Sequence, residues 1–279
     1  ELAAAGLEDD TIVFYYSDHA SPMPRSKRFC YDDGVRVPLI VKVPEKWRHL
    51  LPEAPGSHIA APVSLVDLLP TFAEIIGITP PDDLPGQTFM GAKRQARRYT
   101  FSGRDRMDEH YDLTRTVRSE RYRYIRNYAP HRIYGQHYAF AWNGLGYQDF
   151  EAEHLANRLT EPQESFWHGK PAEELYDMDA DPDAVVNLAG DPDYAATLDE
   201  MSKALDAHML ATHDCGFIPE GSDAEAVGMR DDPLVYPVAE VIELAARAIR
   251  RDPGEASHFV AALGHNSSSV MRYWGAQGL

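Results

Sequence analysis

The sequence has 279 residues, of which 44% are hydrophobic and 25% charged, and this is ordinary for a globular protein with a sizeable core. Asp and Glu (44) outnumber Lys and Arg (27), and the formal net charge of −17 argues against a nucleic-acid-binding protein. No apolar run approaches the roughly 18–20 residues that a membrane helix needs. The two cysteines, Cys30 and Cys215, define no disulfide framework.

The first predicted core element is the apolar run from Thr11 to Tyr16, which is typical of a strand buried on both faces. It ends in Ser17-Asp18-His19. A second predicted strand, Val37 to Val43, follows a loop that carries basic residues (Arg25, Lys27 and Arg28). Because ligands of open α/β sheets bind at the carboxyl ends of the strands, this turn and this loop are predicted to border one site.

The residue types at this site indicate metal and anion chemistry. Asp18 and His19 can both ligate one divalent ion, and Lys27 would then face the anion that the ion holds. Such an arrangement suits a substrate that is negatively charged and gains charge during reaction. The alternative is that Asp18 caps a turn and His19 is solvated, and the residues alone leave both interpretations open.

A helix is predicted from Ser64, with Ser64 and Asp67 as a capping box and Gly77 as its end. The Pro- and Asp-rich stretch 79–86 is the predicted subdomain boundary. Residues 99–102 and 115–128 are then expected to be strands of a smaller sheet. The second alternates Arg with Tyr, which predicts a half-exposed strand.

Positive charge is concentrated between residues 91 and 132, where 12 Lys and Arg stand against five Asp and Glu. This basic island could focus an anionic substrate, or it could be a solvated face paired with acids. Within it, Arg104 and His110 are candidate recognition residues, although a structural Arg-Asp cluster explains them equally well. The aromatic segment 134–150 could stack on sugars, but packing under a long loop is favoured.

Helices are predicted after Asp191, with Pro192 at the first position, and over Pro237–Arg251, followed by a second and a third helix, the third over 266–278. The stretch 269–276 resembles the signature of HEAT-type helical repeats, which would offer a surface for a protein partner. We expect that such a repeat is truncated here.

Several motifs, in order, resemble the type I sulfatases of the alkaline-phosphatase-like superfamily. They cover residues 8–220 and are Ser17-Asp18-His19-Ala20, Lys27, Tyr31-x-x-Gly34-x-Arg36-x-Pro38, Ser64-Leu65-Val66-Asp67-Leu68-Leu69-Pro70-Thr71, Tyr122-Arg123-Tyr124-Ile125-Arg126-Asn127, Glu174-Leu175-Tyr176-Asp177 with Asn187-Leu188-Ala189, and Gly216-Phe217-Ile218-Pro219-Glu220. By this resemblance Asp18 and His19 are calcium ligands and Lys27 contacts the sulfate. Loops of the smaller subdomain, with Arg104 and His110, would border the pocket. Ala20 stands where the family has Gly, so a slightly strained turn is expected.

The resemblance implies an α/β fold in three parts. Residues 1–85 would be the end of a mixed sheet sandwiched by helices, 86–230 a smaller α+β subdomain with an antiparallel sheet, and 231–279 an all-α HEAT-like tail. The family forms its formylglycine nucleophile in a C/S-x-P-x-R motif, which this sequence lacks. We therefore expect a C-terminal portion of a longer enzyme that is inactive alone, its nucleophile and paired Asp-Asp lying elsewhere.

The leading hypothesis is hydrolysis of a sulfate ester, with a sulfated carbohydrate as the substrate class. Two alternatives are a phosphatase or phosphodiesterase of the same superfamily and a non-catalytic binding module that uses the helical repeat. The resemblance favours a periplasmic or extracellular location, and the residues themselves do not decide it.

Overall fold

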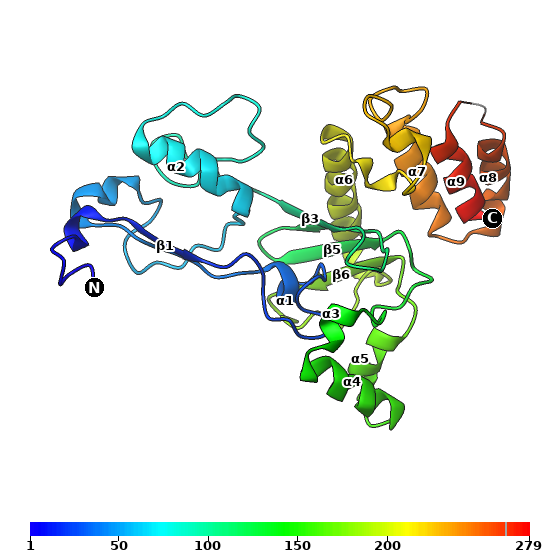
Figure 1. Ribbon diagram of the computed structural model, residues 1–279, viewed down its shortest axis with the longest axis horizontal. Coiled ribbons are helices and arrows are strands. Elements are labelled where there is room, and N and C mark those ends of the chain that lie inside the picture. The colour runs from blue at the N-terminus through cyan, green and yellow to red at the C-terminus, as the bar shows by residue number, and fades with distance from the viewer. Residues whose placement is uncertain (266) are drawn as a thin grey trace.

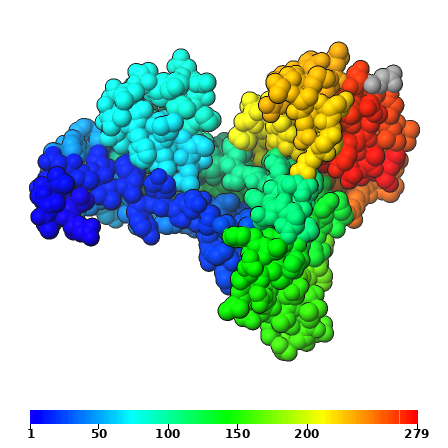
Figure 2. All heavy atoms as spheres, viewed as in Figure 1, coloured from blue at the N-terminus to red at the C-terminus, as the bar shows by residue number. Residues whose placement is uncertain are grey.

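The computed structural model describes residues 1–265 and 267–279. Three lobes project from a central sheet: the N-terminal lobe with β1, β2 and α2, a lobe of α3 to α5, and a helical lobe that starts at α6 and ends with the C-terminus (Figures 1 and 2). The strands are β1 (Val13–Tyr16), β2 (Leu39–Lys42), β3 (Thr100–Arg104), β4 (Thr114–Arg118), β5 (Tyr122–Asn127) and β6 (Glu173–Asp177). The α-helices are α1 (Asp32–Val35), α2 (Leu68–Ile76), α3 (Ala139–Trp142), α4 (Leu145–Leu155), α5 (Glu161–Glu164), α6 (Ala195–Ala211), α7 (Val238–Ala248), α8 (Ala256–Leu263) and α9 (Ser269–Gly278).

The N-terminal lobe is built on a two-stranded antiparallel ribbon in which β1 pairs with β2, from Val13 opposite Lys42 to Tyr16 opposite Leu39. Both predicted strands are therefore present, within a few residues of their predicted bounds. Burial of the first strand on both faces was wrong, because Tyr15 and Tyr16 are 62% and 45% exposed. In the part of the chain that the structure describes, β1 has one neighbouring strand, so a mixed sheet sandwiched by helices is not formed there.

The predicted helix after Ser64 is present as a short 3₁₀ turn (Leu65–Asp67) that runs into α2. The backbone N–H of Ser64 donates to Asp67 Oδ2 at 2.9 Å, which confirms the predicted capping role of that carboxylate. At the other end Gly77 has φ = 74°, a left-handed conformation that glycine adopts without steric cost, and α2 ends there as predicted.

The central sheet has four antiparallel strands in the order β3-β4-β5-β6. The region 115–128, predicted as one strand, is a hairpin of β4 and β5 whose turn spans 119–121. Its expected half-exposed pattern was wrong, because five of the six residues of β5 are buried, arginines included. Alternating polar and apolar residues normally mark one solvated face, but here other parts of the chain cover both faces.

Two apolar clusters explain this burial. Tyr124 and Leu175 belong to a cluster that also contains buried residues of α6, α7, α8 and α9. Ile125 and Tyr176, their neighbours along each strand, belong to a second cluster with Phe29, Tyr31 and residues of α3 and α4. Because side chains alternate between the faces of a strand, the sheet is packed on both sides, and the residues just before α1 are part of its core.

The predicted C-terminal helices are present as α6 to α9, and Asp191 caps the turn before α6 by accepting from the Asp193 N–H at 3.0 Å. The predicted start of the last helix at Asn266 lies outside the described residues. Helix α9 is capped by Ser268, and Trp274 within it donates to the Phe217 carbonyl at 2.9 Å. The HEAT resemblance and the boundaries at 85 and 230 stay predictions, although the last three helices share a core with the sheet.

Among the described residues, every helix is too short or too polar to span a membrane.

Candidate active site

The turn after β1 holds its two metal-ligand candidates close together. Ser17 Oγ donates to the His19 carbonyl at 2.7 Å, and His19 Nδ1 lies 2.7 Å from the Ala20 carbonyl. A carbonyl can only accept, so this contact favours a proton on Nδ1 and leaves Nε2 with its lone pair. That Nε2 lies 3.5 Å from Asp18 Oδ2, and the Asp18 side chain is 84% exposed. The strain expected at Ala20 is absent, because its φ is not positive.

These two donor atoms fit part of a divalent-cation site. Ligands at about 2.4 Å on adjacent corners of an octahedron lie about 3.4 Å apart, close to the separation of the two atoms here. The oxygen of Asp18 suits calcium, whereas imidazole is the ligand of softer divalent metals. Among the described residues no group of three or more His, Cys, Asp or Glu could enclose an ion. The turn therefore offers two ligands, and any others would have to come from outside this set.

The loop from Ser21 to Arg28 returns Lys27 to this turn. The Lys27 N–H donates to the Ser21 carbonyl at 3.1 Å, so the backbone of Lys27 lies beside the residue that begins the loop. Two non-glycine residues of the loop have left-handed backbones, Arg25 at φ = 63° and Arg28 at φ = 82°. Such conformations cost energy and persist where surrounding contacts enforce them, commonly at functional sites.

Lys27 is not engaged by an acid. No carboxylate of the described chain lies within ion-pair distance of its ammonium, which stands 5.5 Å from the centre of the Phe140 ring. The neighbouring Arg28 differs, because Asp108 lies 2.8 Å from its guanidinium and neutralises it. Lys27 thus keeps a positive charge available for an anion, and its backbone lies beside Ser21, two residues after His19.

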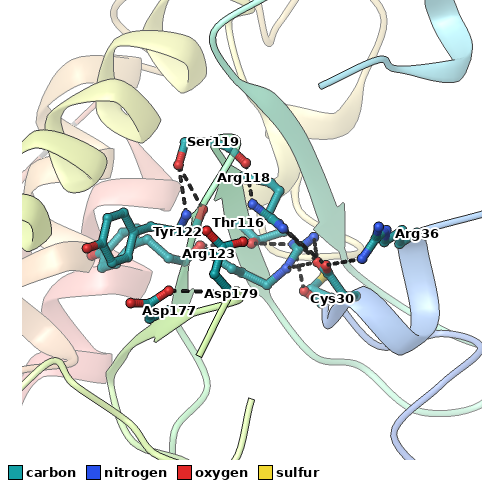
Figure 3. Close-up of polar contacts among 11 residues, drawn as sticks. Cys30, Arg36, Thr116, Arg118, Ser119, Tyr122, Arg123, Asp177 and Asp179 are labelled. Atoms are coloured by element: carbon teal, nitrogen blue, oxygen red, sulfur yellow. Dashed lines mark hydrogen bonds and ion pairs between the residues drawn. The ribbon is translucent and has the colours of Figure 1, made fainter. Parts of the chain in front are cut away.

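The segment that follows the loop is fixed to the central sheet by buried ion pairs. Arg123 Nε donates to Asp32 Oδ1 at 2.7 Å, and Arg118 Nε lies 3.3 Å from the same oxygen. Figure 3 shows both arginines reaching from β4 and β5 toward the segment of Cys30 and Arg36. Burial alone would raise the pKa of Asp32, but the two guanidinium groups outweigh it, and the pKa lies below its ordinary value.

A second anchor is the buried carboxylate of Glu174 on β6. It accepts hydrogen bonds from the hydroxyls of Tyr31 (2.6 Å), Tyr134 (2.7 Å) and Tyr176 (2.6 Å), and from Asn127 Nδ2 (2.6 Å). Burial and this carboxylate raise the pKa of all three tyrosines, so they stay protonated and keep donating. The hydrogen bond to Glu174 therefore fixes Tyr31, which lies four residues after Lys27 in the sequence.

Gly34 is required by close approach. A Cβ atom there would lie 2.2 Å from the Phe29 carbonyl oxygen and 2.3 Å from that of Ser26. Both contacts are with backbone of the loop that carries Lys27, so any larger residue would push that loop away from α1. The Tyr-x-x-Gly motif therefore has a physical role in packing the loop.

The two recognition candidates lie in different environments. The His110 ring is 6.3 Å from the Tyr138 ring, and Tyr138 in turn lies 5.2 Å from the Arg28 guanidinium. His110 is thus one aromatic ring away from the Lys27 loop. Arg104 is only 3% exposed and stacks on Phe29. Its Nε and one terminal nitrogen have no hydrogen-bond partner among the described residues, and Arg104 lines a cavity of about 10 Å³, room for one water. Direct substrate contact would require movement around Arg104, and its recognition role stays a prediction.

Most of the basic island is neutralised by acids from distant segments. Arg115 pairs with Asp214 at 2.6 Å, and similar pairs engage most other members. These pairs are Arg97–Asp67, Arg98–Glu200, Arg104–Asp112, Arg106–Glu220, Arg118–Asp32, Arg121–Asp177, Arg123–Asp32, Arg126–Asp206 and Lys93–Glu74. The island is therefore mainly a set of structural ion pairs. The pairing with acids expected in the second interpretation is present, but a solvated face was wrong for Arg104, Arg115, Arg123 and Arg126, which are at most 7% exposed.

Comparison with known proteins agrees with the motifs of this site. The family model "Sulfatase" matches residues 1–78, the segment that holds Asp18, His19 and Lys27. These residues are related to the sulfatases. An ulvan-active sulfatase of Formosa agariphila is 36% identical over 222 residues, which is 79% of this chain and 36% of the relative. Human N-sulphoglucosamine sulphohydrolase is 29% identical over 259 residues, which is 84% of this chain and 48% of that enzyme.

The fold agrees as well. A solved structure of a 2-O GAG sulfatase superposes with a TM-score of 0.51 at 23% identity, over 74% of this chain and 37% of that chain. This likeness to the sulfatase is one of fold. The chain spans from about a third to a half of the length of the curated relatives described above.

Sequence reasoning did not single out Asp32, Glu174 or Phe140 as residues of the site. Asp32 and Glu174 belong to the Tyr31-x-x-Gly34 and Glu174-Leu175-Tyr176-Asp177 motifs. Their position next to aromatic residues was the sequence feature that could have indicated buried acids. Their partners lie 91 and 143 residues away along the chain, so pairing could not be read from local spacing.

Proposed function

We propose that this chain forms part of a metal-dependent sulfatase that acts on a sulfated carbohydrate. The observation that supports the proposal is the loop after β1, in a segment related to the sulfatases. There the Lys27 backbone contacts Ser21, just after the turn of Asp18 and His19, and the Lys27 ammonium has no carboxylate partner among the described residues. The relatives support a carbohydrate sulfate as substrate class, since they include an ulvan-active sulfatase and N-sulphoglucosamine sulphohydrolase.

Each residue has a distinct role in this proposal. Asp18 and His19 would hold a divalent cation, calcium by family resemblance, and a cation there would supply Lewis-acid polarisation of the sulfate ester. The ammonium of Lys27 would offset negative charge on the non-bridging sulfate oxygens, and this charge grows as the ester bond breaks. His110 would lie at the rim of the site. The nucleophile and the remaining metal ligands are not assigned to residues of this chain.

The proposal is tested by substitution in the complete gene product, with sulfate release from a sulfated sugar as the readout. Lys27→Ala should lower kcat by about 10²–10³-fold, the usual cost of removing one preorganised charge-stabilising group. Asp18→Ala should lower activity and also weaken calcium binding measured by isothermal titration calorimetry. Lys46→Ala is the matched control, because Lys46 is an exposed cation paired with Asp10 in the same lobe.

Two results would contradict the proposal. One is wild-type turnover of the Lys27→Ala variant together with unchanged calcium affinity of the Asp18→Ala variant. The other is faster hydrolysis of the matching phosphate ester than of the sulfate ester, which would favour a phosphatase or phosphodiesterase.

A further inference from the structure

The aromatic segment 134–150 contains buried, partly buried and exposed rings, and Phe140 is its exposed phenylalanine. Tyr138, Trp142 and Tyr147 are at most 8% exposed and form the second apolar cluster, which agrees with the packing role favoured from the sequence. Phe140 lies between them on α3 and is 56% exposed. Other large apolar residues of this chain are also exposed, so exposure alone assigns Phe140 no role, and its neighbours decide the question.

The fold holds Phe140 next to the candidate active site. The Ala139 N–H at the start of α3 donates to Glu109 Oε1 at 2.7 Å, which fixes that end of the helix. Glu109 belongs to the tight turn in which Met107 and His110 exchange backbone hydrogen bonds. The turn that presents His110 therefore also fixes the first turn of α3, and with it the position of Phe140.

The Lys27 loop is attached to the same segment. The Tyr147 hydroxyl donates to the Met23 carbonyl at 3.2 Å, and the Arg28 guanidinium lies 4.7 Å from the centre of the Phe140 ring. The unpaired ammonium of Lys27 is 5.5 Å from the same centre. An exposed aromatic ring thus stands beside the cation proposed to hold the sulfate, and the Tyr147–Met23 hydrogen bond links the loop of that cation to the segment of the ring.

We propose that Phe140 is a specificity-determining residue on which the sugar ring of the substrate stacks while Lys27 holds its sulfate. The inference rests on the proposed function and names the part of the substrate that the site recognises beyond the sulfate. A pyranose has an apolar face of C–H groups, which can pack against an aromatic ring. A sulfate group at the edge of the pyranose then stays free to contact an ammonium about one ring width away. A sulfate ester without such a face gains nothing from Phe140.

The experiment measures the inhibition constants of three competitive inhibitors of the complete gene product. One is inorganic sulfate, and the other two are sulfated monosaccharides, glucose 6-sulfate and N-sulfoglucosamine. In the wild type at least one sugar should bind more tightly than inorganic sulfate. Phe140→Ala should weaken binding of that sugar about tenfold, equivalent to about 1.4 kcal/mol, and leave the inhibition constant of inorganic sulfate unchanged. Phe140→Trp, which keeps an aromatic face, should restore sugar binding.

The controls separate this inference from the proposed function. Lys27→Ala should weaken inorganic sulfate and sugar alike, and if it weakens neither, the proposed sulfate site fails. If Lys27→Ala weakens both but Phe140→Ala changes neither, the stacking role alone is overturned. Equal binding of both sugars and inorganic sulfate by the wild type would overturn it too. Leu145→Ala, a 73% exposed apolar residue of α4, should behave like the wild type, and equal thermal unfolding of all variants shows that each is folded.

Discussion

At the scale of single residues, buried charges fix the loop that carries Lys27. Asp32 is 7% exposed and Arg123 is 3% exposed, and the charge of Arg123 is compensated in the interior by Asp32, which Arg118 also contacts. The sequence predicted the basic island but not its partners, because an acid 91 residues away pairs with Arg123. Glu174 is similar: its motif was visible, yet nothing local indicated that three tyrosine hydroxyls converge on it.

Asp32→Asn should lower the free energy of unfolding at pH 7 by about 3–5 kcal/mol, because it leaves the Arg123 charge buried without a counter-ion. The folded pKa of Asp32 is depressed, so the stabilisation is fully present above the unfolded pKa of about 3.9. It is lost as the pH falls below that value through the folded pKa. Urea unfolding between pH 7 and pH 3 should therefore show the difference between wild type and variant shrinking at the acidic end.

Asp33→Asn serves as the neighbouring control, because Asp33 is exposed and forms no ion pair with a described residue. It should change the unfolding free energy little at pH 7. A constant difference between Asp32→Asn and wild type across the whole pH range would show that the Asp32 charge does not stabilise the fold.

At the scale of elements, sequence patterns predicted α2 and α6 to α9 but missed α1, α3, α4 and α5, and they predicted strand exposure poorly. The helix predicted from Ser64 began there as a 3₁₀ turn with the predicted capping carboxylate, and α2 ended at the predicted glycine. Strand β5 was misjudged because alternation reports which residues share a face, while burial depends on what packs against each face. Clusters on both sides of β5 come from segments far along the chain, and no local pattern carries that information.

Asp67 connects three elements, and its removal should affect all of them. Its carboxylate accepts from the N–H groups of Ser64 and Gln87 and from Arg97 Nε at 2.9, 2.8 and 3.0 Å, and it is 2% exposed. Asp67→Ala should lower the unfolding free energy by about 3 kcal/mol, since a partly buried guanidinium and two amides lose their acceptor. Amide hydrogen exchange should become faster in α2 and at Gln87 in particular.

Asp82→Ala is the matched control for that substitution, because Asp82 is an exposed carboxylate in the nearby loop. It should leave both the unfolding free energy and the exchange rates unchanged. Unchanged protection of the Gln87 amide in Asp67→Ala would mean that the carboxylate does not organise this segment.

At the scale of the whole molecule, one apolar core extends from the sheet into the C-terminal helices. Val117, Tyr124 and Trp274 belong to the same cluster, although the sequence suggested a separate tail from residue 231. Three helices were predicted in this region, and all three are present as α7, α8 and α9. The packing of these helices onto the sheet was not predicted. An apolar stripe on a helix shows that this face is buried, but not which part of the chain covers it.

Trp274→Ala should destabilise the sheet as well as the helices. Loss of a buried tryptophan side chain costs about 3–5 kcal/mol, and here the hydrogen bond from Trp274 Nε1 to the Phe217 carbonyl is lost as well. Urea unfolding followed by far-UV circular dichroism and by the fluorescence of Trp142 and Trp167 should show one transition shifted to lower urea.

An early transition in circular dichroism, with the fluorescence transition unmoved, would instead show an independent C-terminal domain. Tyr273→Ala, partly buried beside it, should have a smaller effect.

The anchoring of Asp32 and Tyr31 in the central sheet has a consequence for engineering chimaeric enzymes. The position of Lys27 depends on side chains from β4, β5 and β6. Exchanging residues 86–230 between related enzymes would therefore also replace the side chains that hold the Lys27 loop in place. A hybrid that keeps Asp32 with both of its arginines, and Tyr31 with Glu174, should retain the native loop. One that mixes these partners should misplace it even where every residue of the loop itself is unchanged.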